Sequence, residues 1–313
     1  MATELQAAFG FSPGTAAWGL FSQGEGGASV LLGMPEGTDF DELAARLDQC
    51  LVVDCRHELT DPEVGPIAWS VGHIPGAFFL HQDFDLAGPK TGRNGRHPLP
   101  DRETLRRKLE SIGLSDGRQL VAYDDSGGAF AVRLWWLARW LGHREAAVLD
   151  GGIQAWRKAG YPASREAPVA RPGTLTMREP LVAQIDADAV LVGLRDSARL
   201  ILDARSPERF RGEVEPYDPV AGHIPGAVNR PFQANLRPDG RFKPAEVLRD
   251  EYLALLAGRD PSALVHQCGS GVTACHNLLA MEMAGLPGGA LYPGSWSEWC
   301  ADPSRPVATG GAG

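Results

Sequence analysis

The sequence Gly-His-Ile-Pro-Gly-Ala fills residues 72–77 and recurs without change at residues 222–227. Other segments repeat in the same order around these two copies. Residues 52–56 read Val-Val-Asp-Cys-Arg, and residues 201–205 read Ile-Leu-Asp-Ala-Arg. Two ordered series that share a six-residue identity indicate an internal duplication rather than a solenoid of many short repeats. A chain of 313 residues is also long enough for two domains.

Within each half, short apolar segments alternate with helical patterns. In the first half, residues 51–54, 120–123 and 147–149 have the composition of strands, whereas residues 102–111 and 131–141 resemble helices. This alternation predicts the α/β class. We expect two tandem domains, each with a parallel sheet that is covered by helices on both faces.

The composition of the chain changes at two places outside these patterns. Residues 1–33 are rich in Gly and Ala and weakly patterned, so we expect a flexible N-terminal extension. Residues 162–180 contain four prolines and scattered charges, which is typical of an interdomain linker. These assignments leave residues 34–161 for the first domain and residues 181–309 for the second.

In the second half, Cys268 follows the apolar residues 263–267 and precedes Gly-Ser-Gly and a helical pattern. Functional sites of parallel sheets lie at the carboxyl ends of strands. A thiol at a helix N-terminus faces unpaired N–H groups and the positive end of the helix dipole, and both favour the thiolate. The alternative is a buried core cysteine, but a core strand does not need Gly-Ser-Gly beside it. We therefore predict that Cys268 is a nucleophile. The expected backbone cradle for its anionic forms comprises Gly269, Ser270, Gly271, Val272 and Thr273.

The matching loop of the first half differs at the critical position. Residues 119–124 correspond to residues 263–268, so Asp124 occupies the position of Cys268. A carboxylate cannot perform thiolate chemistry. We therefore expect the first domain to be catalytically silent at its own loop.

Composition excludes several classes of protein. The net charge of -9 argues against a broad nucleic-acid surface, and no apolar run approaches the ~18–20 residues that span a membrane. The five cysteines have no CxxC or zinc-site spacing and suit a reducing compartment. Because the N-terminus lacks a basic stretch followed by an apolar one, we expect no signal peptide and a cytoplasmic location.

Taken together, the paired Gly-His-Ile-Pro-Gly-Ala segments, the Asp-x-Arg strand ends and the Cys-Gly-Ser-Gly-Val-Thr-Ala loop resemble the tandem-domain rhodanese sulfurtransferases. The resemblance covers about residues 40–308. It implies two rhodanese-like domains, with the active site in the second domain facing the first. It also implies transfer of sulfane sulfur through a persulfide on Cys268, without a metal or an organic cofactor.

Residues near the cysteine help to choose the sulfur donor. Family members that prefer thiosulfate carry basic residues after the cysteine, whereas this chain has Gly269 and Ser270. The loop is more similar to that of 3-mercaptopyruvate sulfurtransferases, in which an arginine binds the substrate carboxylate. By resemblance this arginine is Arg209, in the Ser-Pro-Glu-Arg-Phe segment at 206–210. The family pattern places a second arginine where this chain has Tyr217, whose hydroxyl can donate a hydrogen bond but carries no charge. Arg211 is the alternative source of that charge.

The resemblance also implies a serine–histidine–aspartate relay for protons. We map it to Ser270, His73 and Asp61. The basic loop at residues 92–98 is interpreted as a solvated loop, and the alternative is that it forms the rim of the cleft. The expected sulfur acceptors are cyanide, a small thiol or a thioredoxin-like protein, and a double-displacement cycle predicts ping-pong kinetics.

The sequence disfavours three alternative functions. A thiosulfate-specific sulfurtransferase is disfavoured by the neutral residues after Cys268. A non-enzymatic sulfur carrier or regulatory module is disfavoured by the complete cysteine loop. A cysteine-dependent phosphatase needs an arginine six positions after the cysteine, where this chain has Ala274.

Overall fold

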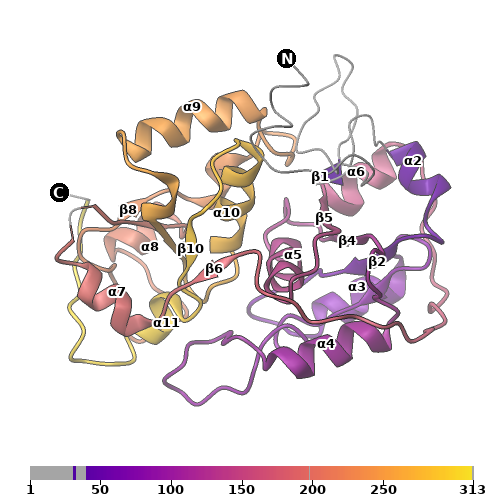
Figure 1. Cartoon of the computed structure of the whole chain (residues 1–313), viewed down its shortest axis with the longest axis horizontal. Helices are drawn as coiled ribbons and strands as arrows, with labels where there is room; N and C mark the ends of the chain where they lie inside the picture. The colour runs from indigo at the N-terminus through magenta and orange to yellow at the C-terminus, as the bar shows by residue number, and fades with distance from the viewer. Residues whose placement is uncertain (1–30, 33–39, 197, 312–313) are drawn as a thin grey trace.

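The computed structural model describes residues 31–32, 40–196 and 198–311. Most of the predicted flexible extension lies outside these ranges. Its Leu31–Leu32 segment is an exception, because it forms strand β1, which pairs antiparallel with β5. The chain forms two α/β halves that lie side by side (Figure 1).

The first half contains one five-stranded sheet with the order β1-β5-β4-β2-β3. Strands β1 and β5 pair antiparallel, and all other neighbouring strands of this sheet are parallel. Its strands after β1 are β2 (Leu51–Asp54), β3 (Phe78–Phe79), β4 (Leu120–Tyr123) and β5 (Ala146–Leu149). Its helices are α2 (Phe40–Ala45), α3 (Val64–Val71), α4 (Arg102–Ser111), α5 (Ala131–Trp140) and α6 (Gly152–Lys158). The strands predicted at 51–54 and 120–123 and the helix predicted at 102–111 are confirmed without a shift.

The second half repeats this plan with the order β6-β10-β9-β7-β8, and all its strand pairs are parallel. Its strands are β6 (Ala183–Gln184), β7 (Leu200–Asp203), β8 (Val228–Asn229), β9 (Leu264–Gln267) and β10 (Ala290–Leu291). Its α-helices are α7 (Ala187–Gly193), α8 (Pro207–Arg211), α9 (Ala245–Leu256), α10 (Ala274–Met283) and α11 (Ser295–Trp299), with short 3-10 turns η1 (Phe232–Asn235) and η2 (Pro261–Ala263). The predicted two-domain α/β architecture is confirmed.

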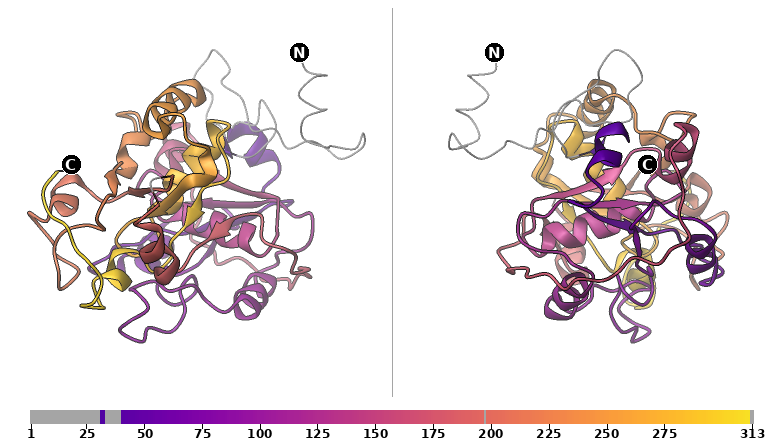
Figure 2. Two further views of the ribbon diagram at one scale, coloured as in Figure 1. Left: turned by 60° about the vertical axis from the view of Figure 1, so that its left-hand side comes forward. Right: turned by 90° about the vertical axis from the view of Figure 1, so that its right-hand side faces the viewer.

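Buried hydrophobic residues form three clusters, and one of them joins the two halves. Alternate strand residues point to opposite faces of each sheet. In the first half, one face packs against α2 and α6, and the other against α4 and α5, as the turned views of Figure 2 show. In the second half, α7, α8 and α11 cover one face, while α9 and α10 cover the other. The inner layers of the two halves merge into one continuous cluster, so the interface between the domains is packed like a core.

Helices α5 and α10 form the centre of this interface (Figure 1). Every residue of α5 except Arg139 is buried, as expected of a helix that is surrounded on all sides. Arg139 instead forms an ion pair with Glu282 of α10, at 2.6 Å. The interface therefore fixes elements of the first half against the helix that begins just after Cys268.

The segment at 162–180 lies along the first half. Ser164 forms a two-way backbone pair with His73, and the N–H of Leu175 donates to the carboxylate of Glu110 at 2.7 Å.

Among the described residues, no helix is long and apolar enough to cross a membrane.

Candidate active site

Cys268 lies one residue beyond β9, at the carboxyl edge of the second sheet. Only 2% of its surface is exposed. Its backbone N–H donates to the hydroxyl of Ser295, at 3.1 Å, and its Sγ accepts from the N–H of Gly271, at 3.2 Å. Gly271 has φ of +77°, and an added Cβ would collide with the carbonyl oxygen of Pro293. A glycine is therefore required where the loop folds back over the sulfur.

The predicted cradle is partly visible around this sulfur. Of its five predicted members, only Gly271 donates to Sγ among the described residues. Ser270 is 95% buried and uses its hydroxyl elsewhere, as described next. The first turn of α10 follows the loop, and its N–H groups are the remaining candidate donors of the cradle.

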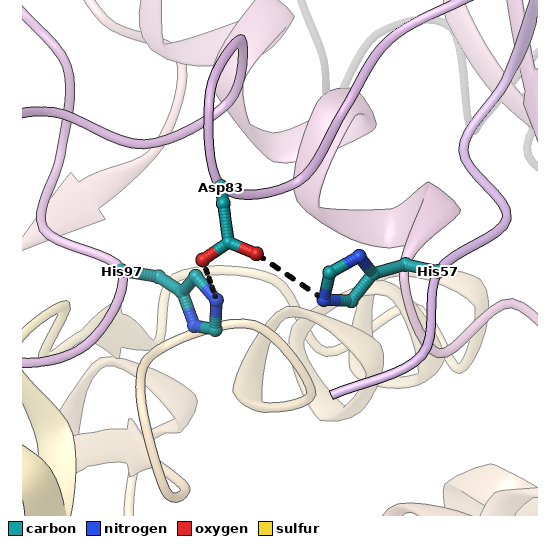
Figure 3. A group of neighbouring side chains, drawn as sticks. All are labelled: His57, Asp83 and His97. Carbon is teal, nitrogen blue, oxygen red and sulfur yellow. Dashed lines mark ion pairs between the residues drawn. The ribbon is translucent and has the colours of Figure 1, made fainter. Parts of the chain in front are cut away.

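The hydroxyl of Ser270 contacts a histidine of the first half. Its Oγ lies 2.7 Å from Nδ1 of His97, and Nε2 of that ring lies 3.2 Å from Oδ1 of Asp83. Figure 3 shows the carboxylate of Asp83 facing the His97 ring. The loop before α4 carries His97 across to the second half, and in Figure 1 it reaches toward α11. The structure thus brings together a serine–histidine–aspartate chain beside the cysteine.

This arrangement corrects two of the predicted site residues. His73 is fully buried, and its ring nitrogens contact the carbonyl oxygens of Trp69, at 2.8 Å, and Glu166, at 3.1 Å. Asp61 is exposed, and its carboxylate accepts from the N–H of Glu63 at the start of α3. Neither residue contacts Ser270, so the prediction that they form its relay is wrong.

The duplication itself explains that error. His223, the second copy of His73, also bonds a backbone carbonyl, that of Phe210, at 2.7 Å. A residue that both halves keep serves the fold of both halves. His97 has no counterpart at the matching place in the second half, and that asymmetry is the sequence signal that could have identified it. The loop at 92–98 agrees with the alternative of a cleft rim, because Arg96 and His97 reach the cysteine loop.

Burial and charge set the protonation of this relay. Burial lowers the pKa of His97, while the hydrogen bond to Asp83 opposes that change. The same hydrogen bond, together with the ammonium of Lys90 at 2.8 Å, holds the pKa of Asp83 well below its usual range. A neutral imidazole therefore faces an ionised carboxylate near neutral pH, and it is free to accept a proton from Ser270.

Substitution of His97 by alanine is expected to lower kcat by about 10²–10⁴-fold, the usual contribution of a positioned acid or base. Because a base with a lowered pKa stays unprotonated in more acidic solution, native activity should persist to a pH below about 6.5, the ordinary value for histidine. The pH profile of kcat, measured for both proteins, checks this. An acid limb that is unchanged in the alanine variant would exclude His97 as the titrating base.

Two arginines converge on the loop from opposite halves. A Cβ added to Gly269 would lie 2.8 Å from Nη2 of Arg96 and 3.3 Å from Nη1 of Arg209. The guanidinium carbons lie 5.5 Å and 4.9 Å from the ring centre of Tyr217. The ring of Tyr217 thus lies against both cations, and the hydrogen-bonding role of its hydroxyl stays a prediction.

Carboxylates fix these two cations. Arg96 forms an ion pair with Asp218, and Arg209 pairs with Glu215, at 2.7 Å. Burial raises the pKa of Asp218. Among the described residues, no hydrogen bond occupies Nη1 of Arg209 or Nη2 of Arg96, the atoms that point toward Gly269. Both are therefore available to a small anion beside Cys268.

A third arginine lies behind the loop. Arg133 of α5 is fully buried and donates to the carbonyl oxygens of Gly271, at 2.9 Å, and His97, at 3.0 Å. Among the described residues, the acidic groups that act on it are the thiols of Cys268 and Cys275. Burial lowers its pKa. This residue was not singled out from the sequence, because its helical pattern indicates only core packing.

The loop of the first half shows what such a loop binds. The carboxylate of Asp124 accepts hydrogen bonds from four backbone N–H groups of its own loop, at 2.8–2.9 Å. The donors are Ser126, Gly128, Phe130 and Ala131. A negatively charged side chain therefore fills the anion cradle of the first half, which agrees with the expectation that this half is silent.

Comparisons with known proteins identify the domain family of the two halves. The model of the rhodanese-like domain matches residues 39–159 and 186–302. A probable 3-mercaptopyruvate sulfurtransferase of Pseudomonas aeruginosa is 50% identical over 273 residues, which cover 86% of this chain and 96% of that protein. A putative thiosulfate sulfurtransferase of Mycobacterium tuberculosis is 38% identical over 85% of this chain and 93% of its own length. The solved 3-mercaptopyruvate sulfurtransferase of Leishmania major superposes with a TM-score of 0.74 at 33% identity, over 84% of this chain and 73% of that one.

Proposed function

This chain belongs to the sulfurtransferases built from rhodanese-like domains, and from that premise we propose that it takes sulfane sulfur from 3-mercaptopyruvate. The observation that carries the proposal is the pair of guanidinium groups that converge beside Cys268 and are open toward Gly269. A donor with one carboxylate next to a keto group matches two such cations. The names of the relatives include both mercaptopyruvate and thiosulfate enzymes.

In the proposed reaction, the thiolate of Cys268 attacks the sulfur of 3-mercaptopyruvate. A new S–S bond forms, the C–S bond breaks, and pyruvate leaves as its enolate. The proton of the donor thiol balances this step, since the enolate carbon must gain one. Ser270 and His97 are placed to carry that proton, with Asp83 holding the imidazole. The N–H of Gly271 and the first turn of α10 stabilise the persulfide anion.

In the second half-reaction, a cyanide ion or a thiol attacks the outer sulfur of the persulfide and regenerates the thiolate. We propose a thioredoxin-like protein as one such acceptor and the cytoplasm as the location. All five cysteines are free thiols, which is the state expected in a reducing compartment.

Thiosulfate remains the second candidate donor because of Arg96. The loop after Cys268 has no basic side chain of its own, but the first half brings this cation to it. A doubly charged donor would benefit from both Arg96 and Arg209. The two donors must therefore be compared directly.

The test is steady-state sulfur transfer to cyanide with each donor, in the native protein and in Arg96→Met and Arg209→Met. Each arginine is expected to contribute about 10–100-fold to kcat/KM for mercaptopyruvate, mainly through KM, since a hydrogen bond to a charged group is worth roughly 1.5–3 kcal/mol. Arg211→Met is the matched control, because Arg211 is paired with Glu213 on the surface. A native preference for thiosulfate would refute the proposed donor.

A further inference from the structure

Two histidines and one carboxylate meet in the first half. His57 follows β2, Asp83 follows β3, and His97 lies in the loop before α4. Their candidate ligand atoms all lie within 4.8 Å of one another. Figure 3 shows the carboxylate of Asp83 between the two rings, with one oxygen directed to each. The relay described above uses Asp83 and His97 but leaves His57 without a role.

The distances suit a small cation. Nε2 of His57 lies 3.7 Å from Oδ2 of Asp83, and Nε2 of His97 lies 3.2 Å from Oδ1. A tetrahedral Zn²⁺ with bonds of about 2.0–2.2 Å separates its ligand atoms by roughly 3.3–3.6 Å. Small movements of the three side chains would therefore complete a three-ligand site that leaves one coordination position open.

The environment also prepares these groups for a metal. The side chains of His57 and His97 are buried, and the His57 ring packs edge-on against the rings of His81, His97 and Phe130. Lys90 pairs with Asp83 at 2.8 Å, and its side chain is half exposed.

We propose that His57, Asp83 and His97 bind a divalent transition-metal ion such as Zn²⁺, and that a bound ion stops sulfur transfer. The binding site follows from the three ligands alone. The inhibition rests on the proposed function, because it acts through the proton relay of Ser270.

The tautomers of His97 connect the two events. To ligate a metal through Nε2, the ring must carry its proton on Nδ1, and it then donates that proton to Ser270 Oγ. The relay needs the opposite tautomer, in which Nδ1 accepts from Ser270 and Nε2–H donates to Asp83. One ring cannot do both, so metal binding and proton relay exclude each other. No electron is transferred, and the imidazole proton only changes nitrogen.

Binding is tested in Cys268→Ser protein, which removes the competing thiolate. Titration with Co²⁺ is expected to give one ion per chain and a visible spectrum without a sulfur-to-metal band. Adding His57→Phe should weaken binding by at least about 10-fold. His266→Leu is the matched control, because His266 is a buried histidine whose ring nitrogens bond nothing within the described residues. Absence of binding in Cys268→Ser, or binding that His57→Phe leaves unchanged, would overturn the site.

Inhibition is tested in protein that keeps Cys268. Zn²⁺ should inhibit sulfur transfer reversibly, a chelator should restore it, and His57→Phe should raise the inhibitory concentration by at least about 10-fold while leaving metal-free activity intact. Equal inhibition of both proteins would place the inhibitory ion on Cys268 and overturn the proposed coupling. If the chain transfers sulfur from neither donor, the proposed function fails, while the Co²⁺ titration still decides the site.

Discussion

Replacement of Cys268 by serine is expected to abolish sulfur transfer from mercaptopyruvate and from thiosulfate, with a loss of at least about 10⁴-fold in kcat. A serine hydroxyl fits the same space, but it is not ionised near neutral pH and cannot form a persulfide. The fold should be unaffected, since the N–H of Cys268 bonds Ser295 through the backbone. Steady-state sulfur transfer to cyanide measures the loss.

Formation of the persulfide on Cys268 can be observed without turnover. After incubation with donor alone, the native protein should gain the mass of one sulfur atom, and Cys268→Ser should not. Cys275→Ser is the control, because burial raises the pKa of Cys275 to about 12 and keeps it a thiol. Its thiol donates to the carbonyl of Gly271, which a hydroxyl can also do. A mass gain that persists in Cys268→Ser would place the nucleophile elsewhere.

Substitution of Arg133 by methionine is expected to lower kcat/KM by about 10²-fold while changing the free energy of unfolding by less than about 2 kcal/mol. Removal of the guanidinium costs its hydrogen bonds to Gly271 and His97, at roughly 1.5–3 kcal/mol each. It also removes the penalty of several kcal/mol for burying a cation that has no carboxylate partner within the described part of the chain. These terms are of similar size and opposite sign.

The loss of activity in Arg133→Met is not offset in this way. Arg133 donates to the loop whose N–H contacts Sγ and to the loop that carries His97, so the substitution removes a hydrogen bond from each loop. Denaturant unfolding and kcat/KM should be measured together with the rate at which iodoacetamide alkylates Cys268. Arg133→Lys keeps the charge but cannot span both carbonyls, so a partial rescue is expected. A large loss of stability with normal activity in the folded fraction would show that Arg133 serves only the fold.

The local sequence was sufficient to predict the elements within each half, but not the contacts between the two halves. Strand ends, helix α4 and the loop at Cys268 could be predicted because propensity and periodicity act over a few residues. The partner of Ser270 could not, since His97 arrives from a long loop of the other half. Arg96 and Arg133 were missed for the same reason: their roles exist only when the two domains dock. Strand β1 pairs antiparallel at a sheet edge and leaves no repeat signal in the second half.

The carboxylate of Asp124 accepts hydrogen bonds from four backbone N–H groups and so occupies the anion-binding loop of the first half. It acts as an anion that is covalently attached to its own binding site. Its effective concentration far exceeds that of any small anion in solution, so free sulfite, thiosulfate or phosphate cannot compete for that loop. Product or salt inhibition of this protein should therefore follow a single-site isotherm, although the chain contains two copies of the fold. We therefore expect the duplicated loop to add no second binding step to the kinetics.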